Sequence, residues 1–199
     1  MDTPPPITVT KLDAARRQLR TAIELWANDG DPVSVHSLAF AAHQIIHDLN
    51  RCNKGPQMLL DSPFIRPEKK NEYIKIVKRD ANFFKHADSR AKGKTRPETE
   101  IEFAPESNEL FIDITITGLQ YLGQSLTEIE LAFWAWFRIQ RPDLLTDAGR
   151  ELLEKTVPAE TAAAFRAMSK QEFLQRAINL IIRSSKTQAA AKSETTCRS

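Results

Sequence analysis

An arginine and a histidine lie seven positions apart in a stretch whose pattern predicts a helix. Arg79 and His86 are the two ends of the segment RDANFFKH. Seven residues make almost two helical turns, so both side chains would lie on one face, about 10 Å apart along the axis. A guanidinium grips a phosphate through several donors, and an imidazole transfers protons near neutral pH. Together these residues could bind and cleave a phosphodiester.

This spacing resembles the R-x(4–6)-H motif of the HEPN superfamily of small helical bundles, many of which are metal-independent ribonucleases. Here six residues separate the pair, and a polar residue, Asp80, follows the arginine. The resemblance implies a homodimer with one composite site, in which Arg79 binds the scissile phosphate and His86 moves the proton. It also implies supporting roles for Asp80 and Asn82, and a toxin or defence role. Residues 82–88 and 35–39 also resemble a set of uncharacterised bacterial proteins.

Basic residues surround this pair and are candidate contacts to RNA. They are Lys75 and Lys85 on the same helix, and Arg90, Lys92 and Lys94 in the basic segment 89–99. The alternative is a solvated helix face followed by a solvated loop, as for most charge runs. The net charge of +2 neither requires nor excludes a nucleic-acid partner.

Three of the four histidines form a stripe on the preceding helix. His36, His43 and His47 are spaced by seven and four residues, which places them on one side of a helix, beside its expected core face. They could line a pocket, and His43 and His47 could share a metal ion. No Glu-x-x-His pattern or cysteine set accompanies them, so we expect a pocket and no metal. The chain also contains no glycine-rich phosphate loop or nucleotide fingerprint, and no cofactor is expected.

The sequence predicts a mainly α fold, a helical bundle with a short β-hairpin insertion. We expect an extended lead-in at residues 1–9, one helical domain at 10–183 and a disordered tail at 184–199. The hairpin is expected at 101–103 and 110–116, although residues 114–122 could equally be helical. Helices should begin at Thr10, Asp31, about Glu68, Ser125, about Ala148, Pro158 and Ser169. Almost complete burial is expected for Leu38, Ile45, Val77, Phe84, Phe133 and Trp136.

Composition indicates a cytoplasmic protein with no membrane partner. The 199 residues are 41% hydrophobic and 27% charged, as in a globular domain. The N-terminus shows no signal-peptide pattern, and the longest apolar run is residues 131–137. Cys52 and Cys197 lie far apart and form no disulfide framework.

Three functional hypotheses follow. The first is a HEPN-like protein that binds RNA or cleaves it without metal, as a homodimer. The alternative is a non-catalytic helical module whose Arg79–His86 face binds a protein partner. The third is a metal-dependent enzyme at the histidine stripe.

Overall fold

A computed structural model describes residues 5–62, 65–86, 89–91, 94–96 and 100–196. Most of these residues lie in helices, which confirms the predicted mainly α class. The chain divides into two compact units, residues 1–125 and 126–199. The single domain expected at 10–183 stays a prediction. None of the helices in the described ranges is long and apolar enough to cross a membrane.

The first unit is built on a pair of helices joined by a short link. α1 (Lys11–Ala27) begins after Thr10, which forms the expected capping box with Asp13. α2 (Pro32–Cys52) begins after Asp31, whose carboxylate accepts a hydrogen bond from the Ser34 N–H. Both helix starts were predicted from these capping residues, which satisfy the free N–H groups of the first turn. α4 (Ser107–Tyr121) packs on both helices.

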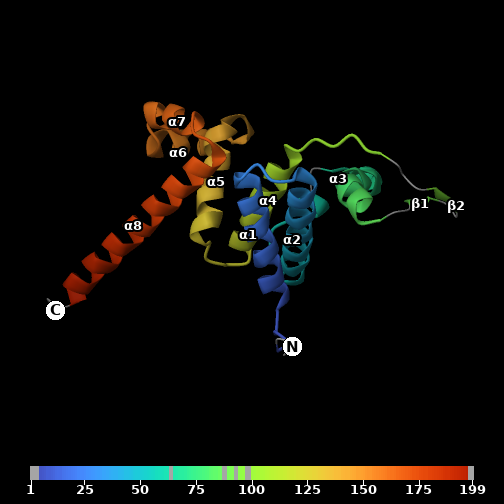
Figure 1. Ribbon diagram of the computed structural model, residues 1–199, viewed down its shortest axis with the longest axis horizontal. Helices are drawn as coiled ribbons and strands as arrows, with labels where there is room; N and C mark the ends of the chain where they lie inside the picture. Colours follow the sequence, from blue (N-terminus) through green and yellow to red (C-terminus); the bar gives the residue numbers. More distant parts are fainter. Residues whose placement is uncertain (1–4, 63–64, 87–88, 92–93, 97–99, 197–199) are drawn as a thin grey trace. The chain divides into compact units, whose positions relative to one another are not determined.

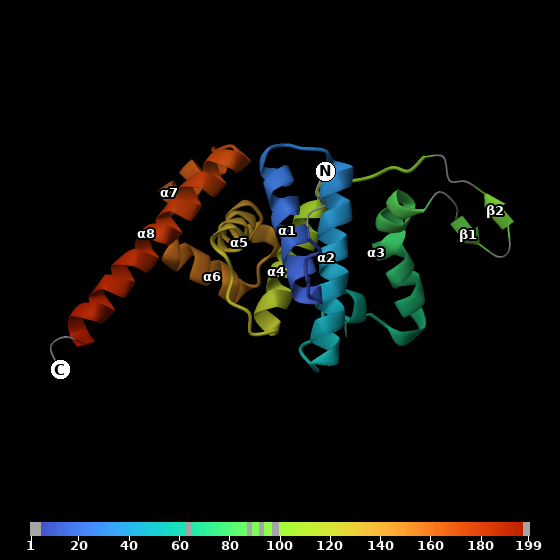
Figure 2. The same cartoon turned by 60° about the horizontal axis from the view of Figure 1, so that its bottom comes forward.

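α3, the helix that carries Arg79, spans Lys70–Lys85 and lies along α2 on the side away from α1 (Figures 1 and 2). Two 3₁₀ turns, η1 (Leu59–Asp61) and η2 (Pro67–Lys69), precede it. The inner side of α3 carries Ala81, which is fully buried. Its outer side is mainly polar, as the sequence predicts, and also exposes Ile76.

The β-hairpin predicted at 101–103 and 110–116 is wrong, because residues 110–116 lie within α4. The buried residues of α4 recur with helical spacing: Asn108, Phe111, Ile112, Thr115, Ile116, Gly118 and Leu119. Burial of this face outweighs the preference of isoleucine and threonine for strands. A pair of short strands lies instead in the expected basic loop, where β1 (Ser89–Ala91) runs antiparallel to β2 (Lys94–Arg96).

The core face of α2 differs from the expected one. Leu38 and Ile45, predicted to be almost fully buried, are only partly buried. The expected core residues Val35, Ala39, Ala42 and Ile46 are buried, but Phe40 and the three histidines enter the core beside them. Val77 and Phe84 of α3 are also only partly buried.

In the second unit, α5 (Glu128–Gln140) packs against α7 (Ala159–Arg166) and α8 (Lys170–Thr196). η3 (Pro142–Leu144) and α6 (Asp147–Thr156) lie between α5 and α7 in the chain. Phe133 and Trp136 are buried, as predicted.

Two predictions for the second unit need correction. α5 is capped by a box of Thr127 and Glu130, so it begins two residues later than the expected box at Ser125 predicts. The expected disordered tail is helical as far as Thr196. Three consecutive alanines at 189–191 have the highest helix propensity and favour this continuation of α8.

Candidate functional site

The outer face of α3 exposes the residues that the sequence assigns to chemistry. Arg79, Asn82 and His86 are all solvent-exposed. His86 follows the last turn of α3, and its backbone N–H donates to the Asn82 carbonyl. The helix therefore presents an arginine and a histidine to solvent about two turns apart. The structure records no hydrogen bond between them.

Arg79 is held in place by two partners. Its Nε donates to Oδ1 of Asp80 at 2.7 Å, and its Nη2 donates to the Glu102 carbonyl at 3.0 Å. The Arg79 side chain remains 59% exposed, whereas that of Asp80 is only 18% exposed. Asp80 thus orients the guanidinium, and the rest of that group faces solvent. Arg79 also has a structural role, because it ties α3 to the segment leading into α4.

The other predicted RNA contacts divide into different environments. Lys75 is exposed on α3. Lys85 turns toward α2, where its Nζ lies 3.4 Å from Oε1 of Gln44 and 5.5 Å from the ring centre of Phe40. Arg90 lies in β1 and Lys94 lies in β2. Lys92 lies outside the described residues.

Charge along the chain is concentrated in this region. Residues 67–96 contain ten Lys or Arg and four Asp or Glu, a net charge of +6. The whole chain carries +2, so the remaining residues together carry −4. α3 and the two short strands are therefore the basic part of an otherwise acidic chain.

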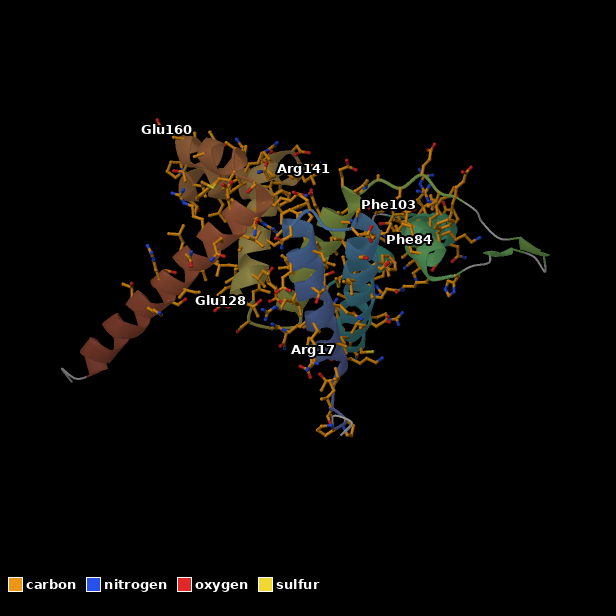
Figure 3. All side chains as sticks on the ribbon, viewed as in Figure 1. Arg17, Phe84, Phe103, Glu128, Arg141 and Glu160 are labelled. Carbon is orange, nitrogen blue, oxygen red and sulfur yellow. The ribbon has the colours of Figure 1, made fainter. Side chains whose placement is uncertain are left out.

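The histidine stripe is part of the core, and it does not flank it as expected. His36 is 1% exposed and is surrounded by the rings of Phe40, Phe84, Phe103 and Phe111. The nearest of these ring centres, that of Phe103, is 5.1 Å away. Figure 3 shows Phe103 beside Phe84 at α3, and their ring centres are 5.1 Å apart. These rings separate His36 from water, and burial lowers its pKa.

The Asn108 side chain determines which ring nitrogen of His36 carries the hydrogen. The Asn108 Nδ2 donates to the Pro32 carbonyl, so its Oδ1 must face the His36 Nδ1, 2.9 Å away. A carbonyl oxygen only accepts, so the neutral imidazole carries its hydrogen on Nδ1. Asn108 was not singled out from the sequence, yet it joins α2 to α4.

His43 is the most secluded of the three. It is fully buried, and neither ring nitrogen has a hydrogen-bond partner among the described residues. Burial is the main cause that lowers its pKa to about 4, with the nearby His47 and Lys78 contributing and Asp61 opposing. His43 is therefore neutral near pH 7.

His47 alone of the stripe reaches a cleft. Its Nδ1 lies 3.5 Å from Oδ1 of Asp48, and its Nε2 lies 3.4 Å from Oδ1 of Asp61. It lines a cleft of about 280 Å³ between α2, η1 and α3. The expected pocket thus exists at His47, whereas His36 and His43 lie in the core. Asp61, Lys70 and Lys78 were not recognised from the sequence as part of this cleft, because the three elements meet only in the fold.

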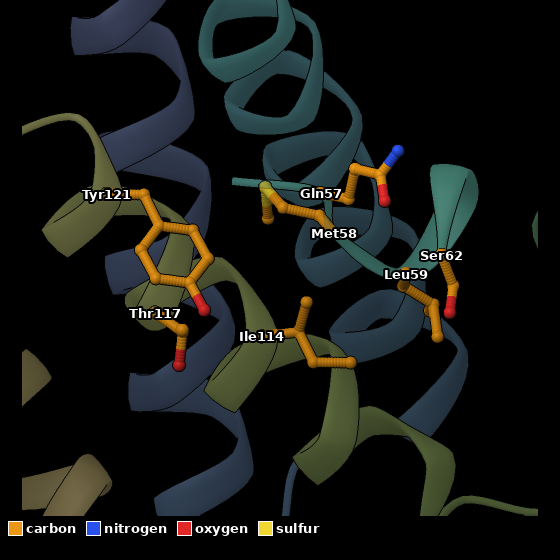
Figure 4. Close-up of a pocket in the computed structure, with 7 residues that line it drawn as sticks. All are labelled: Gln57, Met58, Leu59, Ser62, Ile114, Thr117 and Tyr121. Atoms are coloured by element: carbon orange, nitrogen blue, oxygen red, sulfur yellow. The ribbon is translucent and has the colours of Figure 1, made fainter. Parts of the chain in front are cut away.

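A second hollow, of about 240 Å³, lies between residues 57–62 and α4 (Figure 4). Met58, Leu59 and Ile114 supply its apolar surface, and Thr117 and Tyr121 contribute hydroxyl groups. It contains no acid, base or cation, so it offers no chemistry by itself.

Metal binding gains no support from this geometry. Among the residues that the structure describes, no three His, Cys, Asp or Glu side chains are grouped so that they could hold a metal ion. Comparison of the chain with known protein families, with curated proteins and with solved structures gives no match.

Proposed function

We propose that the chain binds RNA through the basic region at residues 67–96 and cleaves single-stranded RNA without a metal ion. The observation that carries this proposal is the concentration of charge, +6 in this region against −4 in the rest of the chain. A basic surface attracts a phosphate backbone by releasing its condensed counterions. The resemblance of Arg79 and His86 to the HEPN motif supports cleavage in addition to binding.

His86 and Arg79 each have a role in this reaction. His86 takes the proton from a ribose 2′-hydroxyl, and the 2′-oxygen attacks the adjacent phosphorus. The bond to the 5′-oxygen breaks, and that oxygen takes a proton from water. Arg79 stabilises the extra negative charge on the phosphoryl oxygens. The products are a 2′,3′-cyclic phosphate and a 5′-hydroxyl.

The same face supports association of two copies. Ile76 is 67% exposed on α3, although isoleucine is normally buried. Docking of a second α3 would cover Ile76 and bring two Arg79–His86 pairs together. We therefore propose a homodimer with a composite site.

Ile76 also favours a second candidate, a protein-interaction module without catalysis. An apolar side chain among polar ones is common in protein interfaces. In that case Ile76→Asp would abolish partner binding, and no RNA would be cut.

The decisive experiment uses the full chain, labelled single-stranded RNA and excess EDTA. We expect cleavage that leaves 2′,3′-cyclic phosphate ends, and no cleavage of RNA whose 2′-hydroxyls are methylated. His86→Ala should abolish cutting and retain most of the binding. Arg79→Ala should weaken both, whereas Arg17→Ala, an exposed arginine on α1, should change neither. Failure of every RNA to be cut, with unchanged binding by Arg79→Ala, would refute the proposal.

A further inference from the structure

The cleft at His47 lies on the side of α3 opposite to Arg79. Lys70, Ile74 and Lys78 line it from α3, and their spacing of four residues places them along one side of the helix. Arg79 is about 140° away from the middle of that side, at 100° per residue. The cleft is therefore separate from the surface proposed to bind RNA.

Two lysines line the cleft and form no ion pair with an acid among the described residues. Lys70 and Lys78 are partly buried, and neither makes an ion pair or hydrogen bond within the described parts of the chain. Lys69, beside Lys70 in the sequence, is exposed and pairs with Glu72 at 2.8 Å. Removing an ammonium group from water costs free energy unless a negative charge approaches it. A negatively charged ligand in the cleft would therefore stabilise both ammonium groups.

A buried imidazole forms the opposite wall. The His47 side chain is only 7% exposed, and its Nε2 lacks a properly oriented hydrogen-bond partner among the described residues. Asp61, the closest acid, already accepts a 2.6 Å hydrogen bond from the Met58 N–H. Asp48 pairs with Arg51 at 3.1 Å. Both acids thus already have a partner, whereas the two lysines have none among the described residues.

We propose that this cleft binds the phosphate group of a small phosphomonoester between Lys70 and Lys78, beside His47. The lysines begin about 12 Å apart along the helix axis, and their flexible stems allow both ammonium groups to converge on one group. A phosphate offers several oxygens to such converging donors. The lining carries three Lys or Arg and two Asp, a net charge of +1 before the imidazole is counted. This small excess suits one phosphate group, and the volume of about 280 Å³ leaves room for a sugar-sized remainder.

The test is calorimetric titration of the full chain with inorganic phosphate and with ribose 5-phosphate, at constant ionic strength. We expect one saturable site. Lys70→Gln and Lys78→Gln should each weaken binding about tenfold, because each removes a charge-assisted hydrogen bond. Lys69→Gln is the matched control, since it removes the same charge outside the cleft and should leave the affinity unchanged. Tighter binding of ribose 5-phosphate would identify an organic phosphate as the ligand, and equal binding would identify free phosphate.

Two results would overturn the inference. One is the absence of saturable phosphate binding by the folded wild-type chain. The other is an equal loss of affinity in Lys69→Gln and Lys78→Gln, which would indicate diffuse attraction to the basic helix. Circular dichroism confirms that each variant folds, and glutamine keeps most of the lysine stem. RNA binding at the outer face is measured separately, because either site can fail without the other.

Discussion

The Asn108 side chain accepts a hydrogen bond from His36 Nδ1 at 2.9 Å, which joins α4 to the first turns of α2 inside the core. Asn108 is 2% exposed, and its Nδ2 also donates to the Pro32 carbonyl at 2.9 Å. Both the oxygen and the nitrogen of the amide therefore have a hydrogen-bond partner. This one side chain thus links two positions that are 72 residues apart in the chain.

Replacement of Asn108 by leucine should cost about 1–3 kcal/mol of unfolding free energy. The change leaves the hydrogen on His36 Nδ1 buried without a partner, and a buried unsatisfied donor carries a desolvation penalty. Urea titration measures the loss. Asn71→Ala, an exposed asparagine on α3, should stay within about 0.5 kcal/mol. Equal effects of the two changes would show that the buried amide contributes nothing.

The helix starts at Thr10, Asp31 and Ser169 were predictable because capping is a local interaction. In the structure the Ser169 hydroxyl and backbone N–H both bond to the Glu172 carboxylate. The sequence also placed Arg79 and His86 on an exposed face, since helical spacing alone separates them from the buried side of α3. Such features depend on a few neighbouring residues and need no knowledge of the fold.

The face of α2 and the identity of α4 were not predictable in this way. Histidine counts as polar in a periodicity pattern, so the core face was placed toward Leu38 and Ile45. The aromatic rings that bury His36 come from α2, α3, α4 and the segment before α4. In α4, the helical spacing of Phe111, Ile112 and Thr115 was present but was outweighed by their strand propensity. The cleft at His47 likewise exists only once three elements pack together.

Burial of His43 should make the protein less stable in mild acid. Its pKa is about 4 in the folded chain and about 6.5 when unfolded. Between these values the unfolded chain binds more protons, so the free energy of unfolding rises with pH and falls as the solution is acidified. We expect a loss of about 2–4 kcal/mol from pH 7 to pH 4, measured by urea titration across this range.

His43→Leu tests this assignment, because leucine cannot be protonated. The variant should show a flatter pH dependence, with part of the slope retained since the pKa of His36 is also lowered. His86→Gln, at an exposed position, should keep the wild-type slope. An unchanged slope in His43→Leu would assign the acid sensitivity to other groups.

Arg79→Ala should reduce stability by about 1 kcal/mol, because it removes the hydrogen bond to the Glu102 carbonyl. His86→Ala should change it by less than about 0.5 kcal/mol, since the His86 side chain is exposed. Thermal and urea unfolding measure both. Arg17→Ala is the control for loss of an exposed arginine. If Arg79→Ala matches Arg17→Ala, the contact to Glu102 does not hold the segment before α4.

At Gly118, α4 packs tightly against Ile46 of α2 and against Met58. A Cβ at this position would lie 2.6 Å from Cγ2 of Ile46 and 2.6 Å from Cε of Met58. The Met58 side chain can move aside at low cost because it is flexible. Ile46 cannot, because it is fully buried and its branched side chain has few rotamers.

Gly118→Ala should therefore destabilise the protein by about 1–3 kcal/mol through overpacking, although alanine is the better helix former. Gly149→Ala is the matched control, since its Cβ would meet only ordinary contacts of 3.4 and 3.5 Å in α6. Without a clash, helix propensity predicts that this change stabilises by up to about 1 kcal/mol. Urea titration of both variants should thus give opposite signs. A stabilising Gly118→Ala would mean that α2 and α4 are farther apart than the structure places them.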